Sequence, residues 1–274
     1  MSQTSDPLDI IFSPAQVART GTAYIEDRSA NNGDGVPFGV PSVDDDLLPL
    51  LPGEVLVLIA RPGHGKTMHL MRWARHRAHW LQMNQITDKV VVYLTLEQAV
   101  EELHAFHVAA ECGIPVDIMA RGQLDEAQLE IVRDYGVRRV SSPLWFIGHS
   151  IERRRQRPVI SLTNVERALA RVENWEKENR RDLKIDMIMV DYLQRLPLEG
   201  SPESKIVGID NNLNKLKDLA LQFACPVCVG VQSKREVDNY QVPIPEMGDG
   251  AWCSGIEQIP DRVLACVRPI KYKK

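Results

Sequence analysis

From residue 54 onwards the chain alternates short apolar runs with longer stretches of helical periodicity, and this alternation restricts the fold more than any other feature. The apolar runs are nearly continuous, which is typical of strands buried on both faces of a sheet. We predict strands at Val55–Ala60, Val90–Leu94, Leu144–Ile147, Met187–Val190, Val227–Val231 and Val263–Val267. We predict helices at Thr67–Gln82, Ala99–Glu111, Asp125–Tyr135, Asn164–Arg180 and Asp210–Phe223. This order predicts an α/β fold with a mainly parallel central sheet flanked by helices, and ligands at the carboxyl ends of the strands.

The first 35 residues precede this pattern and are polar, so we predict an N-terminal arm and hinge over 1–35 and one domain over 36–274. Ser13-Pro14, followed by AQVARTGTAYIEDRS, predicts a short helix with proline in its first turn. Asn31-Asn-Gly-Asp-Gly35 predicts a flexible hinge after it. A helix placed in this way has little to pack against in its own subunit. It either docks on a neighbouring subunit or forms a frayed tail.

Composition limits the classes of function. The net charge is −4, so any contact with nucleic acid must be local to loops. No run of 18 apolar residues is present and the chain does not start like a signal peptide, so we expect no membrane span. The five cysteines, an odd number, fit a reducing cytosol, and we expect a cytoplasmic protein.

Two short patterns have structural interpretations. Cys225-Pro-Val-Cys228 has the spacing of a metal or redox motif, but it opens an apolar run and has no second pair, so we interpret it as part of the core. Thr163-x-x-Glu166 predicts a capping box at the start of the fourth helix.

Residues 60–67 read Ala-Arg-Pro-Gly-His-Gly-Lys-Thr, which is the P-loop pattern with alanine at its first position. An apolar strand precedes this segment and an amphipathic helix follows it, so a chance turn containing Gly-Lys-Thr is the less favoured interpretation. Glycines let backbone N–H groups turn toward a triphosphate, and the helix N-terminus adds a favourable dipole. We predict that ATP binds at Arg61, Pro62, Gly63, His64, Gly65, Lys66, Thr67 and Met68. Lys66 would reach the β- and γ-phosphates, and the Thr67 hydroxyl would hold Mg²⁺.

Polar residues follow three other predicted strands. Asp191 comes after the strand at Met187–Val190, where a carboxylate can orient the magnesium shell. Glu97 lies just beyond another strand end, where it can polarise the attacking water. Gln232 follows a third, where it can sense the γ-phosphate. Because carboxyl ends of parallel strands share one edge, we expect these side chains to meet the P-loop.

With these residues identified, roughly residues 36–269 resemble the motor domain of DnaB-type replicative helicases, which has a RecA-like P-loop ATPase core. The matching stretches read GVPFGVPSVDDDLLPLLPGEVLVLIARPGHGKT, VVYLTLEQAVEELHAFHVAAECGIP, IDMIMVDYLQRL, CPVCVGVQSKREVDN and SGIEQIPDRVLACVRP. The family commonly has Ala-Arg-Pro at the start of its P-loop, which accounts for Ala60. The predicted helix within 13–30 occupies the place of the family's linker helix, which docks on the adjacent subunit.

The resemblance implies an ATP hydrolase that forms a hexameric ring, with ATP between subunits and single-stranded DNA in the pore. It implies that Lys66 and Thr67 bind phosphate and Mg²⁺, that Glu97 activates water, and that Asp191 orients the metal shell. Gln232 would couple the nucleotide state to a pore loop. Loader or replisome proteins are expected partners.

Three departures from the family bear on this expectation. Only about 35 residues precede the core, so we expect the primase-interacting domain to be missing. After VRPIKYKK no strand carries the family's Lys-x-Arg, and Arg268, Lys271 and Lys273 are poorly positioned substitutes, so we expect the trans-acting arginine to be supplied otherwise or to be absent. The stretch SIERRRQRPVIS at 150–161 is unusually basic, and it is either a solvated face or a contact for DNA or a partner.

Two segments are expected to face the pore. Residues 197–208 carry one cation, Lys205, and residues 233–250 carry Lys234, Arg235 and Tyr240. The cations would contact the DNA backbone and Tyr240 would stack on a base, unless they are ordinary exposed residues.

We therefore predict an ATP-dependent, DnaB-like DNA helicase or translocase acting in DNA replication. Two alternatives stay open. The chain is a RecA-like ATPase that switches assembly or loads partners without unwinding, or it is a non-hydrolysing module of a larger replisome, mobile-element or defence complex.

Overall fold

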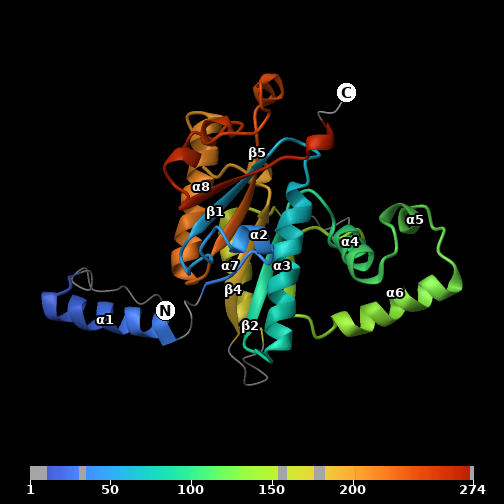
Figure 1. The fold of residues 1–274 in the computed structure, drawn as a ribbon, viewed down its shortest axis with the longest axis horizontal. Helices are drawn as coiled ribbons and strands as arrows, with labels where there is room; N and C mark the ends of the chain where they lie inside the picture. Colours follow the sequence, from blue (N-terminus) through green and yellow to red (C-terminus); the bar gives the residue numbers. More distant parts are fainter. Residues whose placement is uncertain (1–10, 31–34, 154–158, 176–182, 201, 272–274) are drawn as a thin grey trace. The chain divides into compact units, whose positions relative to one another are not determined.

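The computed structural model describes residues 11–30, 35–153, 159–175, 183–200 and 202–271 (Figure 1). The chain divides into two compact units, residues 1–35 and 36–274. The first contains helix α1 (Pro14–Ala30), as the sequence predicts. Ser13 and Gln16 cap it reciprocally, because each backbone N–H donates to the other's side-chain oxygen. Most of the predicted hinge, residues 31–34, lies outside the described residues.

The second unit is built on a six-stranded sheet with the order β3-β2-β4-β5-β1-β6, and every strand pair is parallel. The strands are β1 (Val55–Ala60), β2 (Lys89–Thr95), β3 (Leu144–Ile147), β4 (Lys184–Asp191), β5 (Val227–Gln232) and β6 (Arg262–Cys266). The six predicted strands are thus confirmed, with the bounds of β1 and β3 as predicted. Strands β2 and β4 begin earlier than predicted, because polar Lys89 and Lys184 pair with each other at the amino ends of the two strands, where an apolar pattern gives no signal.

Helices cover both faces of the sheet (Figure 1). On one face α3 (Lys66–Met83) packs its buried residues, among them Leu70 and Trp73, against β1, β2 and β4. On the other face α7 (Leu162–Glu173) and α8 (Lys205–Gln222) form a second core with the alternate strand residues. Both faces of the strands are therefore buried from solvent, which explains the nearly continuous apolar runs.

A small group of helices lies beyond α3, on the side away from α8 (Figure 1). It comprises α4 (Val100–Cys112), α5 (Val116–Ala120) and α6 (Glu126–Arg139), with its own cluster around Val108, Ile114 and Tyr135. Helix α5 escaped prediction because five residues are too short to show helical periodicity. The remaining helical elements are short: α2 (Pro41–Asp44), η3 (Leu193–Arg195), η4 (Arg235–Asn239), η5 (Met247–Asp249), η6 (Gly255–Glu257) and η7 (Pro269–Lys271).

The start and end of α7 differ from the prediction. The N-cap is Ser161, whose hydroxyl accepts from the Asn164 N–H, so the capping box predicted at Thr163 is wrong. The Thr163 N–H and hydroxyl instead both donate to the Glu199 carboxylate, 36 residues away. The helix ends at Glu173 with Asn174 as its C-cap, so the predicted extension through residue 175 is also wrong. Residues 176–180 of that prediction lie outside the described residues.

The cysteines of the CxxC pattern lie on opposite faces of the sheet. Cys225 belongs to the core under α7 and α8, and Cys228 to the core under α3. Both thiols are free and buried, and burial raises their pKa. Among the described helices, none is long and apolar enough to cross a membrane.

Candidate nucleotide-binding site

The P-loop joins the end of β1 to the start of α3. Gly63 and Gly65 have φ angles of 76° and 96°, in the left-handed region where glycine is favoured, and Gly65 is the N-cap of α3. A cavity of about 500 Å³ opens beside this turn. It is lined by Arg61, Pro62, Gly63, Gly65, Lys66, Thr67, Met68, Glu97, Gln98, Phe106, Tyr192, Gln232 and Arg268. Residues at the ends of β2, β4, β5 and β6 therefore meet the P-loop at one cavity.

Lys66 reaches this cavity through a narrow space beside β5. A Cβ atom at Gly230 would lie 2.8 Å from the Lys66 Cδ atom, so glycine leaves room for the lysine stem. The Lys66 ammonium lies 3.6 Å from the centroid of the Tyr192 ring. Burial lowers the pKa of Lys66 to about 8, although Asp191 and Glu97 partly oppose the shift. The site holds a desolvated cation that an incoming phosphate would stabilise.

Asp191 lies at the end of β4, buried behind the cavity rather than lining it. Its Oδ2 atom accepts a hydrogen bond of 3.1 Å from the Tyr93 hydroxyl. Its Oδ1 atom is also buried, and no described residue donates to it at hydrogen-bonding geometry. Burial raises the pKa of Asp191, against the opposing effects of Lys66, the Thr67 hydroxyl and Tyr93. A buried carboxylate oxygen without a donor, beside a threonine hydroxyl, fits a site for hydrated Mg²⁺.

Glu97 follows β2 and is positioned by its neighbours in the chain. The Leu96 N–H donates to the Asp191 carbonyl at 3.0 Å, and the Thr95 hydroxyl donates to the Gln98 carbonyl at 2.6 Å. The Glu97 side chain is about half exposed and lies 3.6 Å from the Arg195 guanidinium. This places an accessible carboxylate at the mouth of the cavity.

Gln232 lines the cavity, and its backbone is held by a residue that the sequence analysis did not single out. The Gln194 amide nitrogen donates to the carbonyls of Gln232 and Ala251, at 3.2 Å and 2.9 Å. The Gln194 amide oxygen accepts from the Gln232 N–H at 3.1 Å. The side chain therefore joins the β4 end to both ends of the segment 233–250.

Two predicted P-loop residues turn away from the cavity centre. Arg61 lines the cavity, but its guanidinium binds Asp238 through two hydrogen bonds, of 2.9 Å and 2.8 Å. His64 is buried toward β6, where its Nδ1 atom accepts from the Arg268 N–H at 3.2 Å. Burial lowers the pKa of His64; Asp238 opposes this shift, and the nearby cations Arg61, Lys271 and Arg268 add to it.

Four other lining residues were missed as site residues. Tyr192 and Gln98 adjoin predicted ones, so their position in the chain was a usable signal. Phe106 comes from within α4, and only the packing of α4 brings it to the site. Arg268 lines the cavity of its own subunit, and the Lys271 ammonium lies 3.5 Å from the Cβ position at Gly63. Lys273 lies outside the described residues.

The candidate DNA contacts have partners within the chain. Lys205 is the first residue of α8 rather than a loop residue, and its ammonium lies 4.8 Å from the Trp252 ring centroid. The Lys234 ammonium donates to the Gly248 carbonyl at 2.7 Å, whereas Arg235 is exposed. The Tyr240 hydroxyl donates to Asp249 Oδ1 at 2.6 Å. Much of the basic stretch 150–161, residues 154–158, lies outside the described residues.

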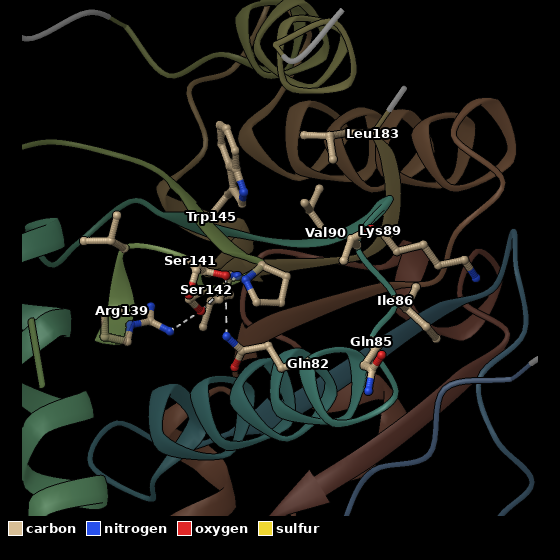
Figure 2. Close-up of a pocket in the computed structure, with 14 residues that line it drawn as sticks. Gln82, Gln85, Ile86, Lys89, Val90, Arg139, Ser141, Ser142, Trp145 and Leu183 are labelled. Carbon is tan, nitrogen blue, oxygen red and sulfur yellow. Dashed lines mark hydrogen bonds between the residues drawn. The ribbon is translucent and has the colours of Figure 1, made fainter. Parts of the chain in front are cut away.

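A larger cavity, of about 780 Å³, lies at the opposite end of the sheet (Figure 2). Lys89 of β2 and Leu144 of β3 line it at their amino ends. Figure 2 shows Gln82 and Arg139 directed toward Ser141 and Ser142, with which they form hydrogen bonds. None of the described residues that line this cavity is acidic. It lacks an acid–base pair and a glycine turn, so the P-loop cavity is the candidate site.

Comparison with known proteins agrees with this geometry. Residues 35–274 match the DnaB-like helicase C terminal domain family. The replicative DNA helicase DnaB of Leifsonia xyli subsp. xyli is 25% identical over 242 residues, which are 88% of this chain and 48% of that protein. The replicative DNA helicase DnaC of Bacillus subtilis is 25% identical over 253 residues, 91% of this chain and 51% of that protein. The chain thus spans about half the length of the curated relatives it matches.

Solved structures share the fold. An ATPase domain superposes with a TM-score of 0.74 and 20% identity, covering 92% of this chain and 83% of that one. A DnaB-like replicative helicase, studied for its interactions with primase, superposes with a TM-score of 0.71 and 20% identity. The superposition covers 90% of this chain and 55% of that one. The predicted RecA-like α/β fold is confirmed.

Proposed function

The chain belongs to the DnaB-like helicase C terminal domain family, and from this membership we propose that it is an ATP-hydrolysing DNA helicase or translocase motor. One observation carries the proposal. Lys66 and Thr67, Glu97, and Gln232, from three separate parts of the sequence, line one cavity, and Asp191 from a fourth part is buried behind it. Random placement of polar residues would not collect a desolvated cation, two carboxylates and a glycine turn at one sheet edge.

The residues present fit ATP with Mg²⁺. The N–H groups after Gly63 and Gly65 would hold the phosphates, with the dipole of α3 and the Lys66 cation in support. The Thr67 hydroxyl and Asp191 would hold the hydrated metal, which would supply neutralisation of charge on the phosphates. Met68 and Pro62 complete the wall of the cavity.

Hydrolysis needs a base for the attacking water, and Glu97 has the position for it. Its carboxylate is accessible and is held near the cavity mouth by the backbone of β2. We assign it the role of accepting the water proton as the γ-phosphate is attacked. Gln232 lies across the cavity at the end of β5, from which the segment 233–250 departs, so it would report the presence of the γ-phosphate to that segment.

We place single-stranded DNA at the segments that leave the carboxyl ends of the strands. Arg235 has an exposed side chain there, while Lys234 and Lys205 would have to leave their partners within the chain to reach a phosphate. A ring, hexameric in this proposal, would place these cations around one strand, with α1 as the arm that docks on the next subunit. Loader or replisome proteins remain proposed partners.

The test is ATP turnover with and without single-stranded DNA. We expect stimulation by DNA in the unmodified protein. Lys66→Ala should abolish ATP turnover. Glu97→Gln should lower the rate of ATP turnover by about 10²–10⁴-fold. Two changes at exposed sites serve as matched controls, Lys184→Ala and Glu130→Gln, and both should retain full turnover. Turnover that survives both site substitutions would contradict the proposal.

A second function is favoured by the internal partners of Lys205 and Lys234, which leave few free cations for DNA. In that case the chain is an ATPase that switches its assembly without unwinding. Nucleotide-dependent oligomers in light scattering, with turnover indifferent to DNA, would establish this function in place of the first.

A further inference from the structure

Arg61 connects the P-loop to a segment that follows a different strand. Its Nε and one terminal nitrogen donate to the two oxygens of Asp238, at 2.9 Å and 2.8 Å. The other terminal nitrogen donates to the Ser233 carbonyl at 3.1 Å. Two of the nitrogens thus form a bidentate pair with the carboxylate, and the third holds the Ser233 carbonyl. The Arg61 side chain is only 12% exposed, whereas Asp238 is 44% exposed, so the arginine lies on the inner side of the contact and the aspartate on the surface side.

The segment on the other side of this contact is a closed unit. At its base, Ser233 and Gly250 form an antiparallel bridge, and the Lys234 N–H donates to the Asp249 carbonyl. Further along, Asp249 accepts from the Tyr240 hydroxyl and from the Glu246 N–H. A displacement of η4, which contains Asp238, would therefore move the rest of the segment as well. The candidate DNA contacts Lys234 and Arg235 belong to the part that would move.

We propose that Arg61 is a positioning residue that links the nucleotide cavity to the segment 233–250 through Asp238. This inference rests on the proposed function, because it assigns a regulatory contact to the same site. Arg61 lines the cavity as well as holding Asp238, so a triphosphate bound there brings a second anion to one guanidinium. The guanidinium turns toward the phosphate, the pair with Asp238 opens, and η4 is released.

This link is separate from the one assigned to Gln232. Gln232 acts along the chain, at the point where β5 becomes the segment. Arg61 acts through space, on a residue six positions further along, and from the P-loop itself. When the guanidinium turns, its bonds to Asp238 and to the Ser233 carbonyl are both lost, so η4 and the residue directly after β5 are both released.

The experiment compares Asp238→Asn with Glu236→Gln in the full chain. Both remove one negative charge from η4, but Asp238 alone binds Arg61, and Glu236 is exposed. Hydrogen exchange of residues 233–250 is measured with and without Mg²⁺ and a non-hydrolysable ATP analogue, and analogue affinity is measured in parallel by fluorescence. We expect the analogue to raise exchange at 235–239 in the unmodified protein and in Glu236→Gln. In Asp238→Asn exchange should already be high and should not respond, while analogue affinity is retained.

A second readout is the ratio of single-stranded DNA affinities with the ATP analogue and with ADP. We expect Asp238→Asn to reduce this ratio by about fivefold or more, and Glu236→Gln to leave it unchanged. The inference is overturned if the analogue binds the unmodified protein without altering exchange at 235–239. It is overturned equally if Asp238→Asn responds like the unmodified protein, or if it loses analogue binding, since Asp238 would then merely support the P-loop. If DNA has no effect on ATP turnover, the proposed helicase function is contradicted. The hydrogen-exchange data at 235–239 would still show whether Arg61 and Asp238 connect the cavity to the segment.

Discussion

The ammonium of Lys66 lies 3.6 Å from the centroid of the Tyr192 ring, so the P-loop cation rests on an aromatic face supplied by the residue that follows Asp191. The ring shields the ammonium from water, and the resulting burial lowers the pKa of Lys66 to about 8. An ordinary lysine carries its charge to a pH above 10. The charge that we propose for phosphate binding is therefore titrated within an accessible pH range.

Nucleotide affinity should fall as the pH rises above 8. Below that pH Lys66 of the free protein is charged, whereas above it the free site must take up a proton in order to bind. We expect ADP affinity to decrease by about tenfold per pH unit above pH 8. A titration with fluorescent ADP between pH 7 and 9.5 measures this. The terminal phosphate of ADP has a second pKa of about 6, so its charge is nearly constant above pH 8, where the fall in affinity is expected.

Tyr192 supplies the control for that prediction. Tyr192→Leu removes the aromatic face and admits water, so the midpoint of the fall should move to higher pH. Tyr192→Phe keeps the ring and should keep the midpoint. A midpoint that is the same in all three proteins would show that the ring does not set the charge of Lys66.

Gly230→Ala should weaken nucleotide binding from the opposite side of the lysine. The new Cβ would lie 2.8 Å from the Lys66 Cδ atom and 3.1 Å from a Leu70 methyl carbon, so the lysine must move or the helix must shift. We expect weaker ADP binding and a loss of about 1–3 kcal/mol in unfolding free energy. Gly136→Ala in α6 is the matched control, because nothing lies within 4 Å of its Cβ position. It should bind ADP normally, and normal binding by Gly230→Ala itself would contradict the prediction.

Gln194→Ala should loosen the junction between β5 and the segment 233–250. The substitution leaves the Gln232 N–H and the Ala251 carbonyl without their side-chain partner, and an unsatisfied group of this kind costs about 1–3 kcal/mol. Urea denaturation measures the cost, and hydrogen exchange should rise at residues 232 and 251. Gln222→Ala, at the exposed end of α8, should alter neither quantity. Equal stability of the two variants would show that the Gln194 amide contributes nothing at this junction.

His107 should make the protein sensitive to mild acid. Its side chain is buried on α4, packs edge-on against Phe146 at 5.8 Å between centroids, and finds no hydrogen-bond partner among the described residues. Burial, aided by Arg139, Arg75 and His104, lowers the pKa of His107 to about 3. Because this lies below the unfolded value of 6.5, the unfolded chain binds more protons, and stability is lost as the pH falls through 6.5.

The expected size of the effect is about 2 kcal/mol between pH 7 and pH 5. His107→Leu should remove this part of the loss, as measured by urea denaturation at both pH values. Other histidines with lowered pKa contribute to the pH dependence as well, so the difference between the two proteins is the relevant quantity. If His107→Leu has the same pH dependence as the unmodified protein, His107 does not titrate as described.

The strands and the P-loop were predictable because their signals are local. A strand buried on both faces needs a continuous apolar run, and a phosphate-binding turn needs glycines followed by Lys66 and Thr67, whatever the rest of the chain does. Parallel strands also place their carboxyl ends at one edge, so the meeting of Glu97, Asp191 and Gln232 with the P-loop followed from the order of the elements alone.

Hydrogen-bond and ion-pair partners that are distant in the sequence were not predictable. Thr163 has the spacing of a cap with Glu166, yet Glu199 satisfies it, because the loop after β4 packs against the start of α7. Arg61 has the position of a phosphate ligand, yet it binds Asp238, 177 residues away. Such a choice depends on which polar groups the sheet register and the loop packing bring within about 3 Å, and a difference of one residue in register changes it. The sequence by itself therefore determined the scaffold and the chemical groups at its edge. Only the tertiary structure decided which of those groups face the cavity and which hold one another.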